Sequence, residues 1–279
     1  MNINPTTLPC VWILALPLTI TLVAGCTGEH SRPGALGHAA TGKLTIGIKF
    51  DQPGLSMRDT DGSVSGFDVE IAEHVAGRLG VQTDGITFKE SPTAQRETMV
   101  ENGQVDFIVA GYTITDQRKS RVGFAGPYYL AGQSLMVRAD NTDITGSDNL
   151  RNKKVCTLKG TTSAQNIDQN FPDTHLHTFD TYSMCLEGLR SGSWDAMTAD
   201  DIILVGYAAQ NAGDFKIVGR PFTTESYGIG VKKDDRELRA KINDAIEAMI
   251  ADGSWEKAFT STVGASGYPI SRPPNVNRY

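Results

Sequence analysis

The sequence predicts an α/β protein made of two units that repeat one order of elements: a strand, a short polar turn and a helix. In the first unit an apolar run at 105–109 leads into the turn 110–118, A-G-Y-T-I-T-D-Q-R. In the second, a strand at 154–158 leads into the turn 159–163, K-G-T-T-S, and a helix that begins at 164. A chain of 279 residues with 39% hydrophobic residues can build a core for both units.

The N-terminal segment differs in kind from the rest. Residues 11–25 are almost wholly apolar or small and end in V-A-G-C at Cys26, which resembles a lipoprotein signal peptide at 1–25, cleaved before Cys26 so that its thiol carries lipid. The start lacks the Lys or Arg usual in such signals. A spanning helix is the rival interpretation, but the run is short and Pro17 interrupts it. We expect 26–42, rich in Gly, Ala and polar residues, to be a flexible tether.

Charge and cysteine content narrow the class of partner. A formal net charge of −6 argues against nucleic acid or anionic lipid as the main partner, because a phosphate-binding surface needs a basic excess. With one cysteine in the signal and Cys26 lipidated, Cys156 and Cys185 remain, and outside the cytoplasm such a pair indicates a disulfide rather than a metal or redox site. His175 and His177 alternate as on one face of a strand, so we expect neither metal nor cofactor.

Two basic residues of the first unit are candidates for binding. The β-branched, alternating stretch 43–49 predicts a strand with Lys49 at its carboxyl end, where open α/β sheets bind ligands. A solvated strand end is the alternative for Lys49. Helices are predicted at 69–79 and about 94–101. Arg96 lies in the first turn of the latter, where the helix dipole disfavours a cation unless an anion is near; a surface ion pair with a neighbouring glutamate is the alternative.

The turn 110–118 has the residues of a carboxylate clamp. Gly111 lets the backbone approach a ligand closely, Thr113 and Thr115 offer hydroxyls, and Arg118 carries a planar fork of donors that suits a carboxylate. The alternative is an ordinary strand end, capped by Thr115 or the aspartate after it, with Arg118 in solvent.

The second unit offers an anion-binding turn and a pair of aspartates. Backbone donors at the helix start, with the hydroxyls of Thr161 and Thr162, make the turn 159–163 suitable for an anion, but the G-x-x-x-x-G-K spacing of a phosphate loop is absent. A strand at 194–197 is followed by Asp200 and Asp201. One of these caps the next helix, and the other could face the cleft as a partner for an ammonium group.

The remaining elements return the chain to the first unit. Strands are predicted at 217–219 and 227–231, followed by an amphipathic helix at 238–250 and a short helix at 255–259. The last residues, 271–279, are rich in Pro, Asn and Arg without periodicity, which predicts a loose tail.

Five motifs, in order over residues 44–259, resemble the polar amino-acid binding proteins of ABC uptake systems, the bacterial solute-binding protein family 3. Within that family, K-F-D-Q-P-G-L, E-S-P-T-A-Q-R-E-T and the cysteine spacing are similar to the glutamate-binding lipoproteins of Gram-positive transporters. The resemblance implies a two-lobed, periplasmic-binding-protein-like fold of type II, with the ligand cleft between the lobes. The motifs are G-F-D-V-E-I-A (66–72), V-D-F-I-V-A-G-Y-T-I-T-D-Q-R (105–118), F-A-G-P-Y-Y (124–129), K-G-T-T-S (159–163) and Y-G-I-G-V (227–231).

The resemblance also implies how an amino-acid carboxylate is held. Arg118, Thr113 and the amide around Gly111 fall where the family binds the α-carboxylate, and Thr161 and Thr162 assist from the second unit.

The other implied contacts select the ligand. Asp200 falls where the family places the carboxylate for the α-ammonium group, and Lys49 and Arg96 fall where binders of acidic amino acids carry basic side chains, with Thr93 beside them. A second ligand carboxylate would pair with these cations, which glutamine would leave unpaired. Gln52 departs from relatives that stack an aromatic side chain on the ligand.

The implied function is that of an extracytoplasmic binding lipoprotein, not an enzyme. The resemblance implies a monomeric protein that is anchored to the cell membrane by Cys26. Its lobes would close on L-glutamate, or also aspartate, and the protein would present this ligand to ABC permease subunits. A sensory module that reports glutamate to a membrane partner is an alternative; a dehydratase-like enzyme would need a cleft acid or base, which the turns lack. The implied layout is lobe 1 at 43–137 and 225–262, lobe 2 at 138–224, and a loose tail at 263–279.

Overall fold

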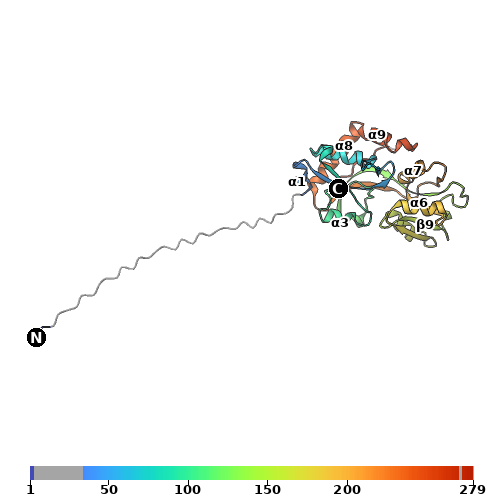
Figure 1. The fold of residues 1–279 in the computed structure, drawn as a ribbon, viewed down its shortest axis with the longest axis horizontal. Helices are drawn as coiled ribbons and strands as arrows, with labels where there is room; N and C mark the ends of the chain where they lie inside the picture. Colours follow the sequence, from blue (N-terminus) through green and yellow to red (C-terminus); the bar gives the residue numbers. More distant parts are fainter. Residues whose placement is uncertain (3–33, 270–271, 279) are drawn as a thin grey trace. The chain divides into compact units, whose positions relative to one another are not determined.

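Two five-stranded sheets carry the fold in this computed structural model, which describes residues 1–2, 34–269 and 272–278 (Figure 1). The predicted signal cleavage site and Cys26 lie outside the described residues. We call the part built on the first sheet the first lobe. Its three parallel strands are extended by two strands from later in the chain, of which β13 runs antiparallel to both of its neighbours, β6 and β7. The strand order is β5 (Ile86–Glu90), β1 (Leu44–Ile48), β6 (Phe107–Ile108), β13 (Glu225–Lys232) and β7 (Val122–Ala131).

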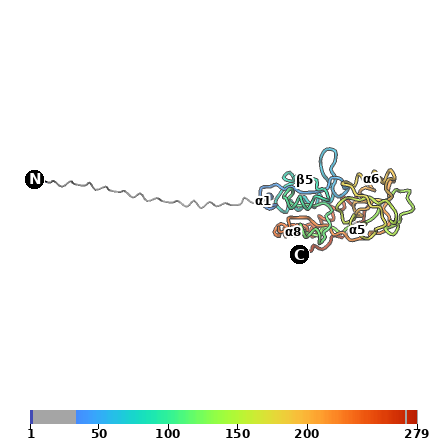
Figure 2. Tube along the Cα trace, turned by 90° about the horizontal axis from the view of Figure 1, so that it is seen from below, coloured from blue at the N-terminus to red at the C-terminus, as the bar shows by residue number. Residues whose placement is uncertain are grey.

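The second sheet forms the second lobe. Its strand β9 pairs in parallel with β10 and β11, whereas β8 runs antiparallel to β11 and β12. In Figures 1 and 2, α6 of this lobe lies apart from α1 and α8 of the first. The strand order is β10 (His175–Phe179), β9 (Lys154–Leu158), β11 (Ala196–Asp200), β8 (Gln133–Arg138) and β12 (Phe215–Val218).

The chain crosses between the sheets twice. The first crossing is at Gly132, between β7 and β8, and the second lies between β12 and β13. The sequence places the division at about residue 138, after β8, but β8 pairs with the second sheet. Residues 133–137 are all buried, so their apolar pattern predicts a central strand without showing which sheet it joins.

The helices predicted from apolar periodicity are present. In the first lobe, α2 and α8 carry buried apolar side chains at helical spacing and pack against each other. In the second lobe the disulfide between Cys156 of β9 and Cys185 of α6 is formed, with the Cα atoms 5.6 Å apart, which confirms that prediction. The helices are α2 (Phe67–Arg78), α3 (Arg96–Glu101), α4 (Asp116–Lys119), α8 (Arg236–Ala251) and α9 (Ser254–Ser261) in the first lobe, and α5 (Thr162–Asn170), α6 (Tyr182–Ser191) and α7 (Asp201–Gln210) in the second.

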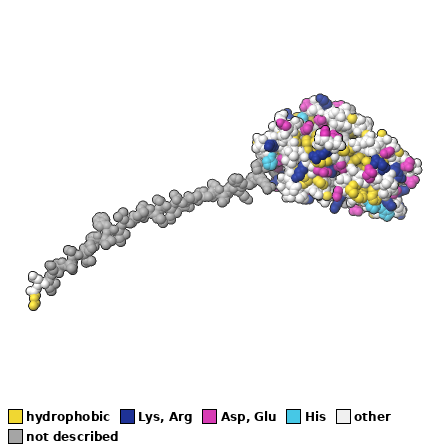
Figure 3. All heavy atoms as spheres, viewed as in Figure 1, with side chains coloured by type: hydrophobic (Ala, Val, Ile, Leu, Met, Phe, Trp, Pro, Cys, Tyr) yellow, Lys and Arg dark blue, Asp and Glu magenta, His cyan; other side chains and the backbone are white. Residues whose placement is uncertain are grey.

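Smaller elements complete the described chain. A three-stranded sheet follows β1, and three short 3-10 helices lie in connections. Within the described residues no helix is both long and apolar enough to cross a membrane. Acidic and basic side chains are interspersed over the face seen in Figure 3. The bounds are β2 (Asp51–Gln52), β3 (Ser56–Arg58), β4 (Val64–Ser65), η1 (Thr83–Gly85), η2 (Ser147–Asn149) and η3 (Gly264–Ser266).

An aromatic cluster fixes the returning helices to the first lobe. Phe67 of α2 contacts Trp255 and Phe259 of α9 edge to face, each with ring centroids 5.4 Å apart. The indole nitrogen of Trp255 donates a hydrogen bond of 2.9 Å to the carbonyl of Tyr128 in β7. Buried aromatic pairs of this kind add to the free energy of area burial, so α9 belongs to the core of the first lobe.

The segment before β1 is a helix in part. Residues 26–42 are predicted as a flexible tether, but Ala35–Ala40 form α1. Its residues Ala35 and Ala39 are buried, and Nδ1 of His38 lies 2.6 Å from Oδ1 of Asp106. The prediction of a flexible tether is therefore wrong for residues 35–40. A composition rich in Gly and Ala does not indicate so short a helix, because tertiary packing stabilises it.

The C-terminal segment also makes specific contacts where the sequence predicts a loose tail. The hydroxyl of Tyr268 donates to Asp201 at 2.7 Å, and the amide of Asn277 donates to the carbonyl of Gly126 at 2.9 Å. Arg278 pairs with Asp244 and Glu247 of α8, at 2.6 and 2.7 Å. Single polar contacts of this kind leave no periodicity in the sequence. For that reason the sequence predicts a loose tail here.

Candidate functional site

A small cavity between the two lobes gathers most of the predicted binding residues. Its volume is about 20 Å³, and every predicted ligand-binding residue except Lys49 lines it. The first lobe contributes Gln52, Thr93, Arg96, Ala110, Gly111, Thr113 and Arg118, and the second contributes Thr161, Thr162, Tyr182, Asp200 and Ile203.

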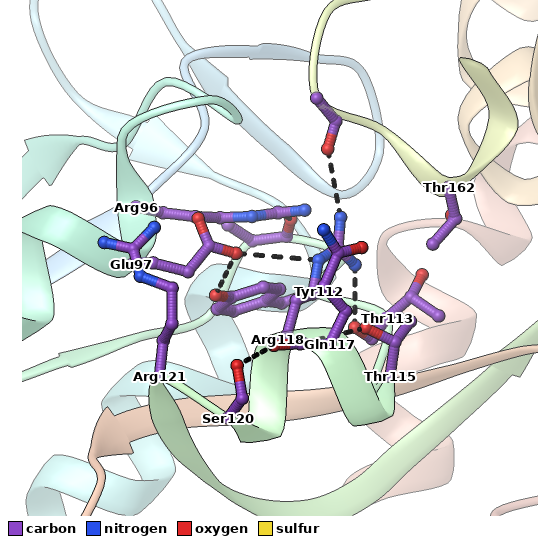
Figure 4. Close-up of polar contacts among 12 residues, drawn as sticks. Arg96, Glu97, Tyr112, Thr113, Thr115, Gln117, Arg118, Ser120, Arg121 and Thr162 are labelled. Atoms are coloured by element: carbon purple, nitrogen blue, oxygen red, sulfur yellow. Dashed lines mark hydrogen bonds and ion pairs between the residues drawn. The ribbon is translucent and has the colours of Figure 1, made fainter. Parts of the chain in front are cut away.

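Arg118 lies at the centre of this cavity wall. The hydroxyl of Thr115 accepts the amide of Arg118 at 3.2 Å and caps α4, which places the guanidinium toward the second lobe. Its Nη1 donates to the carbonyl of Thr113 at 2.7 Å and Nη2 to the carbonyl of Gly160 at 3.2 Å, while Nε lies 3.6 Å from Glu97 (Figure 4).

Burial makes the charge of Arg118 costly. The side chain is only 8% exposed, and burial, followed by the nearby guanidinium of Arg96, lowers the pKa of Arg118 to about 10. It still carries its proton at neutral pH. Thr115 does form the cap that the alternative, an ordinary strand end, predicts. That alternative also predicts Arg118 in solvent, which is wrong because the side chain is buried. A buried cation facing a cavity is a suitable partner for a carboxylate.

Arg96 is a second buried cation beside the first. It begins α3, is 3% exposed, and its guanidinium lies over the ring of Tyr112 at 3.9 Å, as Figure 4 shows. Nη1 donates to the carbonyl of Ala110 at 3.1 Å, and Nε has no hydrogen-bond partner among the described residues. The alternative of a surface ion pair is wrong because the side chain is buried.

Lys49 lies near the cavity but does not line it. The side chain is 1% exposed, so a solvated strand end is wrong for this residue. Its ammonium nitrogen lies 3.5 Å from Oδ1 of Asp51 and makes no hydrogen bond with the described residues. Asp51 is itself tied to the second lobe, since it accepts the amide of Tyr182 at 3.2 Å and its carbonyl accepts the hydroxyl of Tyr207.

The two adjacent aspartates have different partners. Asp201 accepts the amide of Ile202 in α7 at 2.8 Å and that of Gly132 at 3.2 Å. Asp200, 6% exposed, faces the cavity; its Oδ2 accepts the hydroxyl of Tyr227 at 2.6 Å, and Oδ1 has no partner among the described residues. Asp201 therefore accepts hydrogen bonds from backbone amides of α7 and of the connection between β7 and β8. Asp200 keeps one oxygen that is available to a ligand.

Burial is the main influence on the charge of Asp200. It raises the pKa of this carboxyl to about 7, and Glu225 raises it as well, whereas the hydrogen bond from Tyr227 and the charge of Arg118 lower it. An ammonium group at Oδ1 would favour the ionised form. Asp200 can thus serve as the anionic end of a site for a zwitterion.

The amide of Gly111 is directed away from the cavity. It donates to Oδ2 of Asp68 at 2.8 Å, and Oδ1 of Asp68 accepts the hydroxyl of Tyr128 at 2.7 Å. The resemblance implies that the amide around Gly111 binds a carboxylate, but this hydrogen is already used. Gly111 has φ of +52°, and a Cβ there would lie 3.4 Å from the ring of Tyr227, so the position favours glycine.

The threonine hydroxyls of the second lobe also have partners. Thr161 caps α5 by accepting the amide of Ala164 at 3.0 Å, and it donates to the carbonyl of Leu158 at 2.8 Å. The hydroxyl of Thr162 donates to Glu225 at 2.8 Å. What these residues can offer a ligand is therefore the start of α5, where backbone amides are free of intrahelical partners.

Several residues of the site were missed from sequence. Glu225 and Tyr227 of β13 contact Thr162 and Asp200, and Glu97 lies beside Arg118. Tyr227 is within the quoted motif Y-G-I-G-V, which was the available signal, but a buried tyrosine in a strand is usually part of a core. For Glu225, the only signal is a carboxylate at the start of an apolar strand.

The arrangement suits binding rather than bond chemistry. Two buried arginines and one buried aspartate surround the cavity, which matches a small molecule that carries an ammonium group and carboxylate groups. Within the described residues no three His, Cys, Asp or Glu side chains are grouped so that they could hold a metal ion.

Comparisons with known proteins identify a family and similar relatives. The family model of the bacterial extracellular solute-binding proteins, family 3, matches residues 44–264. The glutamate-binding protein GluB of Corynebacterium efficiens is 43% identical over 255 residues, which cover 88% of this chain and 86% of GluB. The glutamine-binding protein GlnH of Bacillus subtilis is 36% identical over 219 residues, covering 78% and 80%.

Solved structures share the fold. An ancestral arginine-binding protein bound to glutamine has a TM-score of 0.75 and 35% identity, over 80% of this chain and 98% of that one. The solute receptor for L-cysteine of Neisseria gonorrhoeae has a TM-score of 0.80 and 27% identity, over 87% and 98%. The amino acids named for these two proteins, glutamine and L-cysteine, differ although the fold is shared. The fold therefore does not identify the ligand of this chain, which has to be inferred from its cavity.

Proposed function

We propose that this chain, which belongs to the bacterial extracellular solute-binding proteins, family 3, captures L-glutamate between its two lobes for uptake by an ABC transporter. The family is one of binding proteins rather than enzymes. The observation that carries the choice of ligand is the pair of buried cations, Arg96 and Arg118, that line the cavity opposite the buried carboxylate of Asp200.

Charge matching supports an acidic amino acid. Burying each charged end of a zwitterion without a partner costs several kcal/mol, so each end requires an opposite charge in the site. Arg118 would hold the α-carboxylate and Asp200 the α-ammonium group. Arg96 then provides a cation for a second carboxylate, and Thr93, buried beside it in the cavity wall, can add a hydroxyl.

The buried charge of Arg96 would also cause the site to reject neutral amino acids. Glutamine would leave Arg96 without an anionic partner, and an unpaired buried charge discriminates more strongly than a missing methylene group. Lys49 does not line the cavity and lies beside Asp51, so its positive charge would support this selectivity only indirectly. The name of the relative GluB is consistent with this ligand.

The cellular setting is part of the proposal. We place the protein outside the cytoplasm as a monomer, anchored to the cell membrane by lipid on Cys26, from which it presents glutamate to membrane permease subunits. Support comes from the V-A-G-C sequence and from the extracellular class of the family.

Isothermal calorimetry tests the ligand. The purified mature protein should bind L-glutamate with a dissociation constant below that for L-aspartate, and far below that for L-glutamine. The absence of heat with both glutamate and aspartate would refute an acidic amino acid as the ligand. Binding of glutamine as tightly as glutamate would refute the role given to Arg96. A thermal-shift screen of the twenty amino acids provides an independent check, since a ligand that binds the folded state raises its stability.

A further inference from the structure

Strand β13 belongs to the first lobe, but two of its side chains bond to residues that line the cavity from the second lobe. Glu225 and Tyr227, two residues apart and therefore on the same face of the strand, bond to Thr162 and Asp200 of the second lobe. We propose that Tyr227 is a positioning residue for ligand binding: its hydroxyl holds one oxygen of Asp200 so that the other receives the ammonium group of the ligand. This inference rests on the proposed function.

Tyr227 is itself fixed in position. Its side chain is fully buried, and its ring lies near those of Tyr128 and Tyr129, with centroids 6.1 and 5.8 Å away. Its backbone forms a β-bridge with Thr113 in the clamp turn, and its ring lies behind Gly111. The phenol therefore has little freedom to follow Asp200 if that carboxylate moves.

The two oxygens of Asp200 have unequal environments. Oδ2 accepts the phenol at 2.6 Å, whereas Oδ1 is buried without a partner among the described residues. A buried carboxylate oxygen without a donor is costly, and a hydrogen bond from a charged donor would be stronger than one from a neutral donor. Tyr227 thus fixes which oxygen remains for the ligand, and through its bond to Oδ2 it connects the carboxylate of Asp200 to the turn 110–118.

The same hydrogen bond affects the charge state of Asp200. Burial raises its pKa to about 7, and the bond from Tyr227 acts in the opposite direction because it stabilises the ionised form. An ammonium group binds the ionised form, so affinity should fall as the pH drops below about 7. The other groups that face Asp200 are Glu225 on β13, Asp201 on α7, Tyr182 on α6 and Arg118 on α4.

The test compares Tyr227→Phe with Tyr128→Phe by calorimetric titration of L-glutamate from pH 5.5 to 8.5. Both variants lose one buried phenol that donates to a buried carboxylate, at 2.6 Å to Asp200 and 2.7 Å to Asp68, so the type of hydrogen bond that is lost is matched. Loss of the bond raises the pKa of Asp200. We expect Tyr227→Phe to move the midpoint of the affinity profile upward by about half a pH unit or more, while Tyr128→Phe keeps the wild-type midpoint.

The affinity of Tyr227→Phe should be at least about threefold weaker than wild type near pH 6.5 and should recover toward wild type at pH 8.5. An equal loss at every pH, or an equal shift in Tyr128→Phe, would overturn the inference. An Asp200→Asn background adds a second measurement, because there the Tyr227→Phe change should leave the residual profile unshifted. Failure of the wild-type protein to bind glutamate or aspartate at any pH would instead refute the proposed function.

Discussion

The guanidinium of Arg118 in the first lobe donates a hydrogen bond of 3.2 Å to the carbonyl of Gly160 in the second. This bond joins the two lobes directly at Arg118, the residue that we assign to the ligand carboxylate. The cavity beside it, about 20 Å³, holds about one water molecule. An amino acid can therefore enter only when the lobes move apart, and Arg118 must exchange protein partners for ligand atoms as they close again.

Arg118→Lys should weaken the binding of every amino acid. Lysine keeps the charge but loses the planar fork that reaches both Thr113 and Gly160. We expect at least a roughly 100-fold loss for glutamate, and a similar loss for glutamine where its binding is measurable. Calorimetry measures both, and a loss confined to glutamate would show that Arg118 contacts the ligand side chain instead.

Arg96→Ala should change specificity rather than abolish binding. It removes the cation assigned to the second carboxylate, so the ratio of glutamate to glutamine affinity should fall by about tenfold or more. Arg121→Ala is the matched control, because Arg121 is exposed and pairs with Glu101 outside the cavity. Equal losses for the two ligands in Arg96→Ala would contradict the assignment.

Lys49→Met should reduce glutamate affinity less than Arg96→Ala does. Lys49 does not line the cavity, and its ammonium group lies 3.5 Å from Asp51, so its effect on a ligand is indirect. Competition titrations of the two variants against the same ligand give the comparison. A loss as large as that of Arg96→Ala would mean that Lys49 reaches the ligand once the lobes rearrange.

Asp200→Asn should weaken ligand binding strongly, with residual binding at high ligand concentration, yet stabilise the unliganded protein at alkaline pH. The folded-state pKa of Asp200, about 7, is above its ordinary 3.8, so the folded state keeps a proton that the unfolded chain has lost between these values. The contribution of Asp200 to the free energy of unfolding is therefore present at low pH and is lost as the pH rises through about 7. Urea unfolding at pH 5 and pH 8 should show a smaller pH dependence for Asp200→Asn than for the exposed control Asp140→Asn.

Loss of the disulfide should destabilise the fold without changing the ligand. Cys156 and Cys185 are 29 positions apart, and a loop of this length corresponds to about 3.5 kcal/mol in the chain-entropy model. The double variant Cys156→Ala/Cys185→Ala should melt at a lower temperature than the oxidised protein. Reductant should lower the melting temperature of the wild type and leave that of the double variant unchanged; sensitivity in the double variant would point to another cause.

The sequence predicted which residues line the cavity better than it predicted the partners of those residues. The clamp turn, residues 110–118, combines Gly111, Thr113 and Arg118 within one segment, so its residue types suggested a carboxylate site, although an ordinary strand end with Arg118 in solvent stayed an alternative. The contact between Tyr227 and Asp200 joins residues of different lobes, and only the crossing of the chain between two sheets brings them together. No local pattern records such a contact.

Burial was the other quantity that the sequence could not provide. Lys49 and Arg96 are polar residues at a strand end and in a first helical turn, positions that are usually solvated. In the folded protein both are almost fully covered. Arg96 lies over the ring of Tyr112 and bonds to Ala110, both in the turn 110–118, and Lys49 lies beside Asp51. Likewise α1 is short and rich in alanine, and its place depends on packing that its own residues do not encode.

The placement of α1 determines which lobe the N-terminal segment joins. Ala35 and Ala39 are buried, and His38 pairs with Asp106 of the first lobe, just after the segment that we propose leads to lipid. At the other end of the chain, Arg278 is bound to α8, also in the first lobe. If Cys26 carries lipid as we propose, the first lobe is therefore the one that follows the anchor along the chain, and the second lobe is joined to it only through the first.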